Sequence, residues 1–540
     1  MLLKGSLSVA AAAAMTGASA AGATADGARS SSGALTGLRI DSGRVQGVPA
    51  ALSSVTVFKG IPYARSTAGA LRWRPPQKTG PWDGVYVADT FGDICPQSGM
   101  PGATLPPMSE NCLNLNVWTA AASPDERRPV FVWIYPGRYS GGYASDPTFD
   151  GAGLARKGLV VVTLNYRVGA FGFLATPALS AEDEHGVSGN YGLLDQIAAL
   201  KWVQRNIAAF GGDPRRVTIA GQSAGASSVY HLIDSPLANG LFHRGISESG
   251  ILSPRDPETA ALATSYRPSM ETAQNQGVAW VGKKRATTLA EMRALSADSL
   301  ITVYGDNDPT VAGPVNGNPP LFRPVLDGYV KPWTYEEALA RGHQNDVPVM
   351  TGNTRDEAGA SPALTTTVAA YQALAARKYG DMAEEFLALY PATTDEEAAV
   401  QTNASIADGL RITPHLFANE WTRRAKSPVF TYFWEHVPPG AEGTQGAYHG
   451  SEINYVFDNL YATDKDWTDA DRSIADTLSD YVVNFATHGD PNGPGLPRWA
   501  ANDPRRPATM EIGDKFRRTA LAEPDKLDFY QRYLLTQAAW

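Results

Sequence analysis

The sequence predicts an α/β protein built on a large, mostly parallel central sheet that is flanked by helices. Five continuous apolar runs are typical of strands buried on both faces, at 130–134, 159–164, 217–220, 347–350 and 429–434. Between the second and third runs, apolar residues recur with helical spacing at Leu193, Leu194, Ile197, Leu200 and Val203. Strand–helix–strand order of this kind indicates parallel strands.

Composition excludes several other classes of protein. The 540 residues carry a net charge of −9, which disfavours a nucleic-acid-binding face. Hydrophobic residues make up 43% and charged residues 19%, so most of the chain is expected to fold. The length alone suggests three or four domains, but no linker divides the sequence after residue 37. We therefore expect one domain over 37–540.

One stretch between two predicted strands has a different character. Residues 368–424 are rich in Ala, Glu and Leu and contain no clear strand. We expect a helical insertion over one edge of the sheet. Whether it moves as a lid stays open at this point.

The N-terminus resembles an export signal. Residues 1–20 contain Lys4 before an Ala-rich apolar run, and Ala18-Ser19-Ala20 fits a cleavage site. Residues 21–36 are rich in Gly and Ser and are expected to form a flexible tether. The alternative is a flexible Ala-rich leader without export. The run is too weakly hydrophobic for a membrane span, so we expect a secreted or periplasmic protein without stable membrane insertion.

The chain has two cysteines, Cys95 and Cys112, and both lie in loop-like sequence. In an exported protein this pair predicts one disulfide. The alternative is two unrelated buried thiols. Neither cysteine has the spacing of a metal ligand.

The motif that carries chemistry is Gly221-Gln222-Ser223-Ala224-Gly225. It follows a predicted strand and precedes a predicted helix, which is the context of a nucleophile elbow. Small flanking residues allow the strand and helix to approach, and the N–H after the serine can face an oxyanion. The alternative is a simple turn between strand and helix.

A serine hydroxyl needs a neighbouring base and a group that orients this base. Composition alone does not choose among the eight histidines, which are His185, His231, His243, His343, His415, His436, His449 and His488.

Several blocks in order resemble the type-B carboxylesterase/cholinesterase family of α/β-hydrolases. They are Phe58–Ala64, Leu71–Pro76, Ser109–Val117, Asn165–Phe173, Asn190–Gln196 and Gly221–Gly225. The resemblance covers most of residues 37–540 and implies the α/β-hydrolase fold. It also implies a serine carboxylic-ester hydrolase that forms an acyl-enzyme on a small-molecule ester and needs no cofactor and no metal.

The family order Ser…Glu…His implies the partners of Ser223. The block Gly352–Glu357 resembles the segment that carries the acid and selects Glu357, with the neighbouring Asp356 as the alternative. The block Tyr448–Ile453 selects His449 as the base. The alternative for His449 is a metal pair with Glu452, which lacks a further ligand cluster.

The loop expected to form the oxyanion hole departs from the family pattern of three glycines. In Tyr135–Gly142 the first and third glycine positions hold Pro136 and Arg138. The resemblance implies backbone donors at Gly137, Arg138 and Ala224. Arg138 keeps its N–H, so the hole survives if the backbone tolerates a side chain there.

Arg138 is also a candidate for substrate binding. Its side chain either pairs with a structural carboxylate or faces the pocket, where it would bind a carboxylate-bearing or polar acyl group. Bacterial fumonisin esterases, which resemble this family and cleave tricarballylate esters, suggest one such substrate.

Two features of the sequence argue against a cholinesterase. Gln222, a second candidate for substrate binding, stands where cholinesterases have Glu, and the Cys95–Cys112 loop has no aromatic residue, which argues against quaternary ammonium substrates. A neutral or aromatic carboxylesterase, or a lipase-like enzyme, is the alternative. A non-catalytic binding protein of this superfamily is disfavoured because Ser223, Glu357 and His449 are all present. The oligomeric state stays open.

Overall fold

The computed structural model describes residues 28–29 (backbone only), 33–99, 104–250, 253, 255–256, 266–303, 305–309, 319–357, 359–360, 366–443 and 445–538. The expected signal peptide, residues 1–20, lies outside them. The expected tether, residues 21–36, lies partly within the described residues. There, β1 (Ala28–Arg29) pairs with β2 (Leu35–Ile40). The expectation of a tether over 21–36 is therefore wrong at these residues, which belong to a small sheet of order β1-β2-β3-β6.

The main sheet of the described chain has eleven strands in the order β15-β14-β13-β12-β11-β10-β8-β9-β7-β5-β4. The strands from β9 to β14 in this order are parallel, and the strands at both edges are antiparallel. Their bounds are β4 Val48–Pro49, β5 Thr56–Pro62, β7 Asn114–Thr119, β8 Arg128–Ile134, β9 Val160–Leu164, β10 Gly212–Gln222, β11 Arg244–Glu248, β12 Val349–Thr354, β13 Val429–Trp434, β14 Thr509–Ile512 and β15 Arg517–Thr519. In the small sheet, β3 spans Gly43–Gln46 and β6 spans Val85–Val87. All five predicted apolar runs therefore contribute to central strands.

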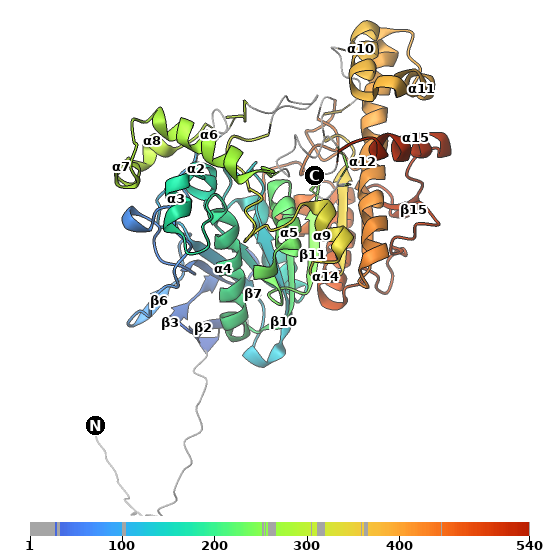
Figure 1. The fold of residues 1–540 in the computed structure, drawn as a ribbon. Helices are drawn as coiled ribbons and strands as arrows, with labels where there is room; N and C mark the ends of the chain where they lie inside the picture. Colours follow the sequence, from blue (N-terminus) through green and yellow to red (C-terminus); the bar gives the residue numbers. More distant parts are fainter. Residues whose placement is uncertain are drawn as a thin grey trace, which may run out of the picture.

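Helices cover both faces of the main sheet (Figure 1). The predicted helix is α4 (Tyr191–Asn206), and it lies with α5 (Ala224–Asp234) on one face. Successive residues of β11 show the two layers, because Gly245 approaches Val229 of α5 while Ile246 lines a cavity with Leu478 of α14 (Asp469–His488). This alternation follows from the two-residue period of a strand.

The stretch expected as a helical insertion is helical. It contains α10 (Val368–Tyr379), α11 (Ala383–Leu389) and α12 (Asp395–Arg424), between β12 and β13. In Figure 1, α10 and α11 project beyond the sheet and lie beside α15 (Pro524–Leu535). Their buried side chains form a second hydrophobic core, separate from the large core around the sheet.

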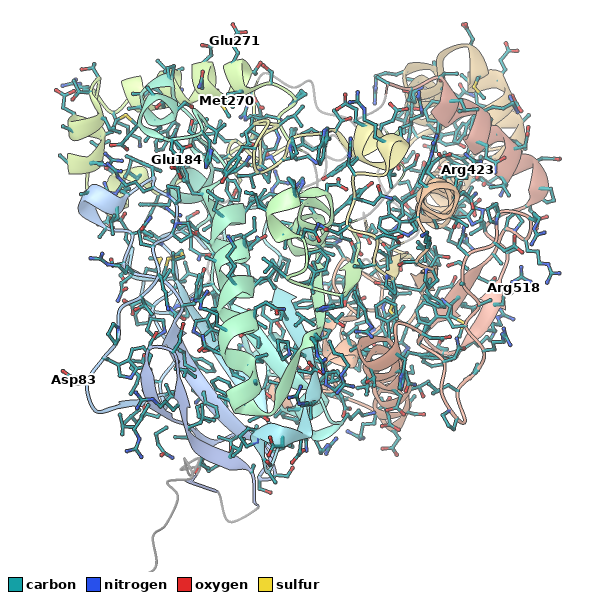
Figure 2. The ribbon with its side chains drawn as sticks, turned by 60° about the horizontal axis from the view of Figure 1, so that its bottom comes forward. Asp83, Glu184, Met270, Glu271, Arg423 and Arg518 are labelled. Atoms are coloured by element: carbon teal, nitrogen blue, oxygen red, sulfur yellow. A yellow bond between two sulfur atoms is a disulfide. The ribbon has the colours of Figure 1, made fainter. Side chains whose placement is uncertain are left out.

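Charged side chains occupy the periphery. In Figure 2, Asp83, Glu271 and Arg518 project from the rim, while the space between the sheet and the helices is filled by side chains. None of the described helices combines the length and apolar character needed to cross a membrane.

Candidate active site

The predicted nucleophile, Ser223, lies in a strained turn at the carboxyl end of β10. Its backbone has φ 56° and ψ −122°, a region that non-glycine residues rarely occupy. Its N–H donates to the carbonyl of Glu248 at 2.9 Å, which fixes the turn against β11. A Cβ at Gly225 would lie 2.0 Å from the carbonyl oxygen of Ile134, and one at Gly221 would lie 2.5 Å from the backbone of Gly225. Both glycines of the motif are therefore required by close backbone approach.

Glu357 and His449 come from loops beyond two neighbouring strands. Glu357 follows β12, and His449 lies between β13 and the short helix α13 (Ile453–Val456). A parallel bridge between Asp356 and Tyr448 joins the two loops. The Glu357 Oε2 atom contacts Nδ1 of His449. The structure thus brings together the acid and the histidine that the sequence predicted, 92 residues apart.

The charge of Glu357 sets the electrostatics of this contact. Burial raises the pKa of Glu357, but the charge and hydrogen bond of His449 outweigh burial and hold the pKa below its usual value. Burial lowers the pKa of His449, but the charge and hydrogen bond of Glu357, together with the charge of Glu452, raise it above its usual value. The histidine is therefore a stronger base than a free imidazole.

Gln222 defines the tautomer of His449. The Gln222 Nε2 atom lies 3.1 Å from Nε2 of His449. Because an amide NH₂ group only donates, the ring nitrogen Nε2 accepts, and the ring proton is on Nδ1 facing Glu357. No hydrogen bond joins Ser223 Oγ to His449 among the described residues. Such contacts are often loose without substrate.

Asp356, the alternative acid, has other partners. Its Oδ2 atom accepts hydrogen bonds from the guanidinium of Arg355 at 2.8 and 3.0 Å and from the N–H of Ala447 at 2.7 Å. These bonds connect the two loops beside His449. Asp356 thus holds the loops, whereas Glu357 contacts the imidazole.

The oxyanion loop has a backbone that accommodates two side chains in the left-handed region. Arg138 and Tyr139 both have φ 56°, and Gly137 has φ 128°. A Cβ at Gly137 would lie 2.2 Å from the carbonyl oxygen of Gly141, so only glycine fits there. Ala224 is the first residue of α5, so its N–H has no acceptor within the helix. The roles of Gly137, Arg138 and Ala224 as oxyanion donors stay predictions.

The disulfide loop supports the oxyanion loop. Cys95 and Cys112 form a disulfide, as predicted, with a Cα–Cα distance of 4.9 Å. Gln97, two residues after Cys95, accepts from the N–H of Gly142 at 2.6 Å and donates to its carbonyl at 2.9 Å. The disulfide thus lies close in sequence to a residue that holds the end of the oxyanion loop.

Arg138 is partly exposed, and its Nη2 donates to the side-chain carbonyl of Asn307 at 2.7 Å. This contact joins the oxyanion loop to the segment 305–309, which contains Asn307. The acceptor in this bond belongs to an exposed residue.

Two buried glutamates near the site form a pair that no sequence motif indicates. Glu248 and Glu452 are each 1% exposed and line one cavity. The sequence had suggested Glu452 only as a metal partner of His449, and no group of three or more potential metal-binding side chains occurs among the described residues. Their burial depends on tertiary packing, for which the sequence carries no local signal.

Comparisons with known proteins agree with this geometry. The model of the carboxylesterase family matches residues 35–529. Fumonisin B1 esterase from Sphingopyxis macrogoltabida is 36% identical over 88% of this chain and 86% of its own length. Para-nitrobenzyl esterase from Bacillus subtilis is 35% identical over 83% of this chain and 89% of its own. A solved structure of PNB esterase has a TM-score of 0.75 at 30% identity and covers 92% of this chain and 99% of its own.

The fold and the elbow define an α/β-hydrolase. The chain belongs to the carboxylesterase family, and it is a carboxylic ester hydrolase that acts on small-molecule esters.

Proposed function

We propose that the protein hydrolyses esters through an acyl-enzyme on Ser223, with His449 as the general base and Glu357 as the group that orients it. The observation that carries the proposal is the position of His449. Its Nδ1 contacts Glu357, and its unprotonated Nε2 is directed to Gln222, the residue before Ser223. The accepting nitrogen of His449 therefore contacts the residue that immediately precedes the nucleophile.

The chemical steps follow from these positions. His449 Nε2 takes the proton of Ser223 Oγ while the oxygen attacks the ester carbonyl, and the charge of Glu357 stabilises the imidazolium. The N–H groups of Gly137, Arg138 and Ala224 stabilise the oxyanion. His449 then gives its proton to the leaving alcohol, and water hydrolyses the acyl-enzyme with the same base.

Labelling of the nucleophile tests this proposal. An organophosphate probe should modify Ser223 in the intact enzyme, as peptide mass spectrometry would show, and Ser223→Ala should lose both labelling and esterase activity. Ser227→Ala is the matched control, because Ser227 is a buried serine on the next turn of α5. Full activity in Ser223→Ala would contradict the proposal.

For the acyl group, we propose a carboxylate-bearing or polar acid, such as the tricarballylate esters of fumonisins. Two observations support it: the cation of Arg138 next to Gly137 of the oxyanion loop, and the similarity to fumonisin B1 esterase. A guanidinium binds a carboxylate with two parallel hydrogen bonds. The bond from Arg138 to Asn307 keeps the guanidinium in place until the substrate replaces it.

An ester panel separates this substrate class from the alternative. Arg138→Ala should reduce kcat/KM for carboxylate-bearing esters far more than for neutral esters. Asn307→Ala, which removes this hydrogen bond but keeps the cation, should preserve the preference for anionic esters. Equal losses on both ester classes in Arg138→Ala would favour the alternative, a neutral or aromatic carboxylesterase, which the similarity to para-nitrobenzyl esterase supports.

We also propose that the enzyme is exported to the periplasm or the medium. The apolar N-terminal run and the disulfide between Cys95 and Cys112 support this location. Fractionation of expressing bacterial cells, together with N-terminal sequencing of the mature protein, tests it. A cytoplasmic protein with an intact N-terminus would contradict the proposal.

A further inference from the structure

Glu248 and Glu452 form a buried carboxyl pair that the catalytic steps above do not use. Glu248 ends β11, and Glu452 precedes α13, three residues after His449. Both are 1% exposed. Among the described residues, none of their four carboxylate oxygens accepts a hydrogen bond from another residue. Buried carboxyl groups without donors are rare because an isolated buried charge is costly.

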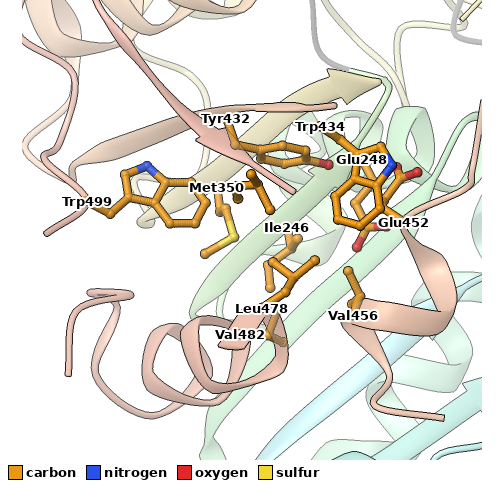
Figure 3. A pocket seen from close by; sticks show the side chains of 11 residues that line it. Ile246, Glu248, Met350, Tyr432, Trp434, Glu452, Val456, Leu478, Val482 and Trp499 are labelled. Carbon is orange, nitrogen blue, oxygen red and sulfur yellow. The ribbon is translucent and has the colours of Figure 1, made fainter. Parts of the chain in front are cut away.

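Most of the other residues that line the cavity of these carboxyl groups are apolar. It lies between the sheet and α14, and Met350, Trp434 and Leu478 contribute to its walls (Figure 3). Its volume of about 10 Å³ is close to the minimum for one water molecule. The carboxyl groups of Glu248 and Glu452 lie on the same side of this cavity in Figure 3.

Such a pair cannot carry two charges. Burial, followed by the charge of the partner glutamate, raises the pKa of Glu248, and burial followed by the charge of Glu357 raises the pKa of Glu452. When one of two neighbouring carboxyl groups keeps its proton, its O–H donates to the other, and the charge-assisted bond is strong in an apolar site. The two groups then titrate as one unit.

The same cavity also contains a hydroxyl group, which makes no hydrogen bond to either carboxyl group in this structure. The hydroxyl of Tyr432 has no hydrogen-bond partner among the described residues, and its ring turns this hydroxyl toward the side where the two glutamates lie (Figure 3). Burial, followed by the charge of Glu248, raises the pKa of Tyr432, so the phenol keeps its proton. The other titratable groups that act on the pair are Glu357 and His449.

One member of the pair interacts with the nucleophile and the other with the catalytic base. The backbone carbonyl of Glu248 accepts the N–H of Ser223 at 2.9 Å, and Glu452 acts on His449 through its charge. We propose that Glu248 and Glu452 share one proton and keep a single negative charge beside His449, which makes both of them positioning residues for the catalytic base. This inference rests on the proposed function of His449.

The pH profile of kcat/KM tests the shared charge, because its acidic limb reports the base of the free enzyme. In Glu452→Gln the charge moves to Glu248, so the limb should shift to lower pH, by about one unit. In Glu248→Gln the charge is confined to Glu452, so the limb should shift to higher pH. The glutamine amide can donate to the remaining carboxylate, which preserves the packing. Any pattern other than these opposite shifts overturns the proposal.

Infrared spectroscopy of the resting enzyme tests the shared proton without any turnover. At neutral pH the spectrum of the parent minus that of Glu248→Gln/Glu452→Gln should show the C=O band of a protonated carboxylic acid. The difference spectrum is needed because burial raises the pKa of Asp234 to about 7, so this group contributes to both spectra. Glu435→Gln is the matched control and should keep the band, because the pKa of the half-buried Glu435 is raised by burial and Glu511, not by the active site. Absence of this band from the difference spectrum overturns the proposal.

The two experiments remain separable from the proposed function. If Ser223 were not the nucleophile, Ser223→Ala would keep its activity, whereas the infrared band would be unaffected. If the double variant did not fold, the parent band and its loss in each single variant would still decide whether the proton is shared.

Discussion

The side-chain amide of Gln222 donates to Nε2 of His449 across 3.1 Å, so the residue before the nucleophile occupies the nitrogen that must accept the nucleophile's proton. This bond fixes the neutral tautomer that a general base requires. It must break when Ser223 transfers its proton. Gln222 therefore holds the base ready and competes with the hydroxyl of Ser223 for it.

This relationship predicts the effect of a charge at position 222. Gln222→Glu places an acceptor next to Nε2, which stabilises the imidazolium and raises the pKa of His449 further. The acidic limb of kcat/KM should move to higher pH by about one unit. Gln222→Met, which is similar in length and uncharged, should not move it upward. An unchanged limb in Gln222→Glu would show that the contact does not persist in solution.

The contact between Glu357 and His449 predicts a large loss on neutralisation. Glu357→Gln removes the charge that stabilises the imidazolium and permits the wrong tautomer, so kcat should fall by about 10³–10⁴-fold with little change in KM. Asp356→Asn is the control, because Asp356 binds Arg355 and Ala447 instead. If Asp356→Asn lost as much kcat as Glu357→Gln, the assignment of the acid would be wrong.

The close approach at Gly137 predicts a defect in transition-state stabilisation. A Cβ there would lie 2.2 Å from the carbonyl oxygen of Gly141, so Gly137→Ala should displace the oxyanion donors and lower kcat by about 10²–10³-fold. Gly158→Ala is the control for backbone strain. Gly158 has φ 102° and nothing lies within 4 Å of its Cβ position, so alanine there introduces strain without a clash. Equal kinetics in the two variants would count against Gly137 as a donor.

The disulfide predicts two effects that can be separated. Replacement of Cys95 and Cys112 by Ala opens a loop of sequence separation 17 and should lower the free energy of unfolding by about 3 kcal/mol, measured in urea. It should also lower kcat, because Gln97 would no longer hold Gly142 firmly. Gln97→Ala should lower kcat while keeping most of the stability. An undiminished kcat in both variants would refute the support of the oxyanion loop.

Short-range sequence patterns predicted the central strands and the helical insertion. The run 429–434 is β13, the run 130–134 lies within β8, and the helical insertion over 368–424 is helical. The choice of Glu357 over Asp356 came from resemblance, and the structure supports it through the contact with His449. These features follow from periodicity or from family blocks.

Other features depend on packing between distant segments. The contact of Gln222 with His449 joins residues 227 apart, and the cavity of Glu248 and Glu452 needs walls from four strands and two helices. The expectation of a flexible tether is wrong at Ala28–Arg29, because these residues pair with a strand although the surrounding sequence is rich in Gly and Ser. No pattern within a short window carries this information.

The second hydrophobic core has a consequence for biosynthesis. Tyr530 of α15 donates to the carbonyl of Ser405 at 2.6 Å, and Arg532 pairs with Glu385, so α15 closes the insertion. Because a chain folds as it leaves the ribosome, α10, α11 and α12 emerge with this core open. This core stays open until α15 has also been synthesised, so a truncated variant that lacks α15 would expose the apolar surface of the insertion.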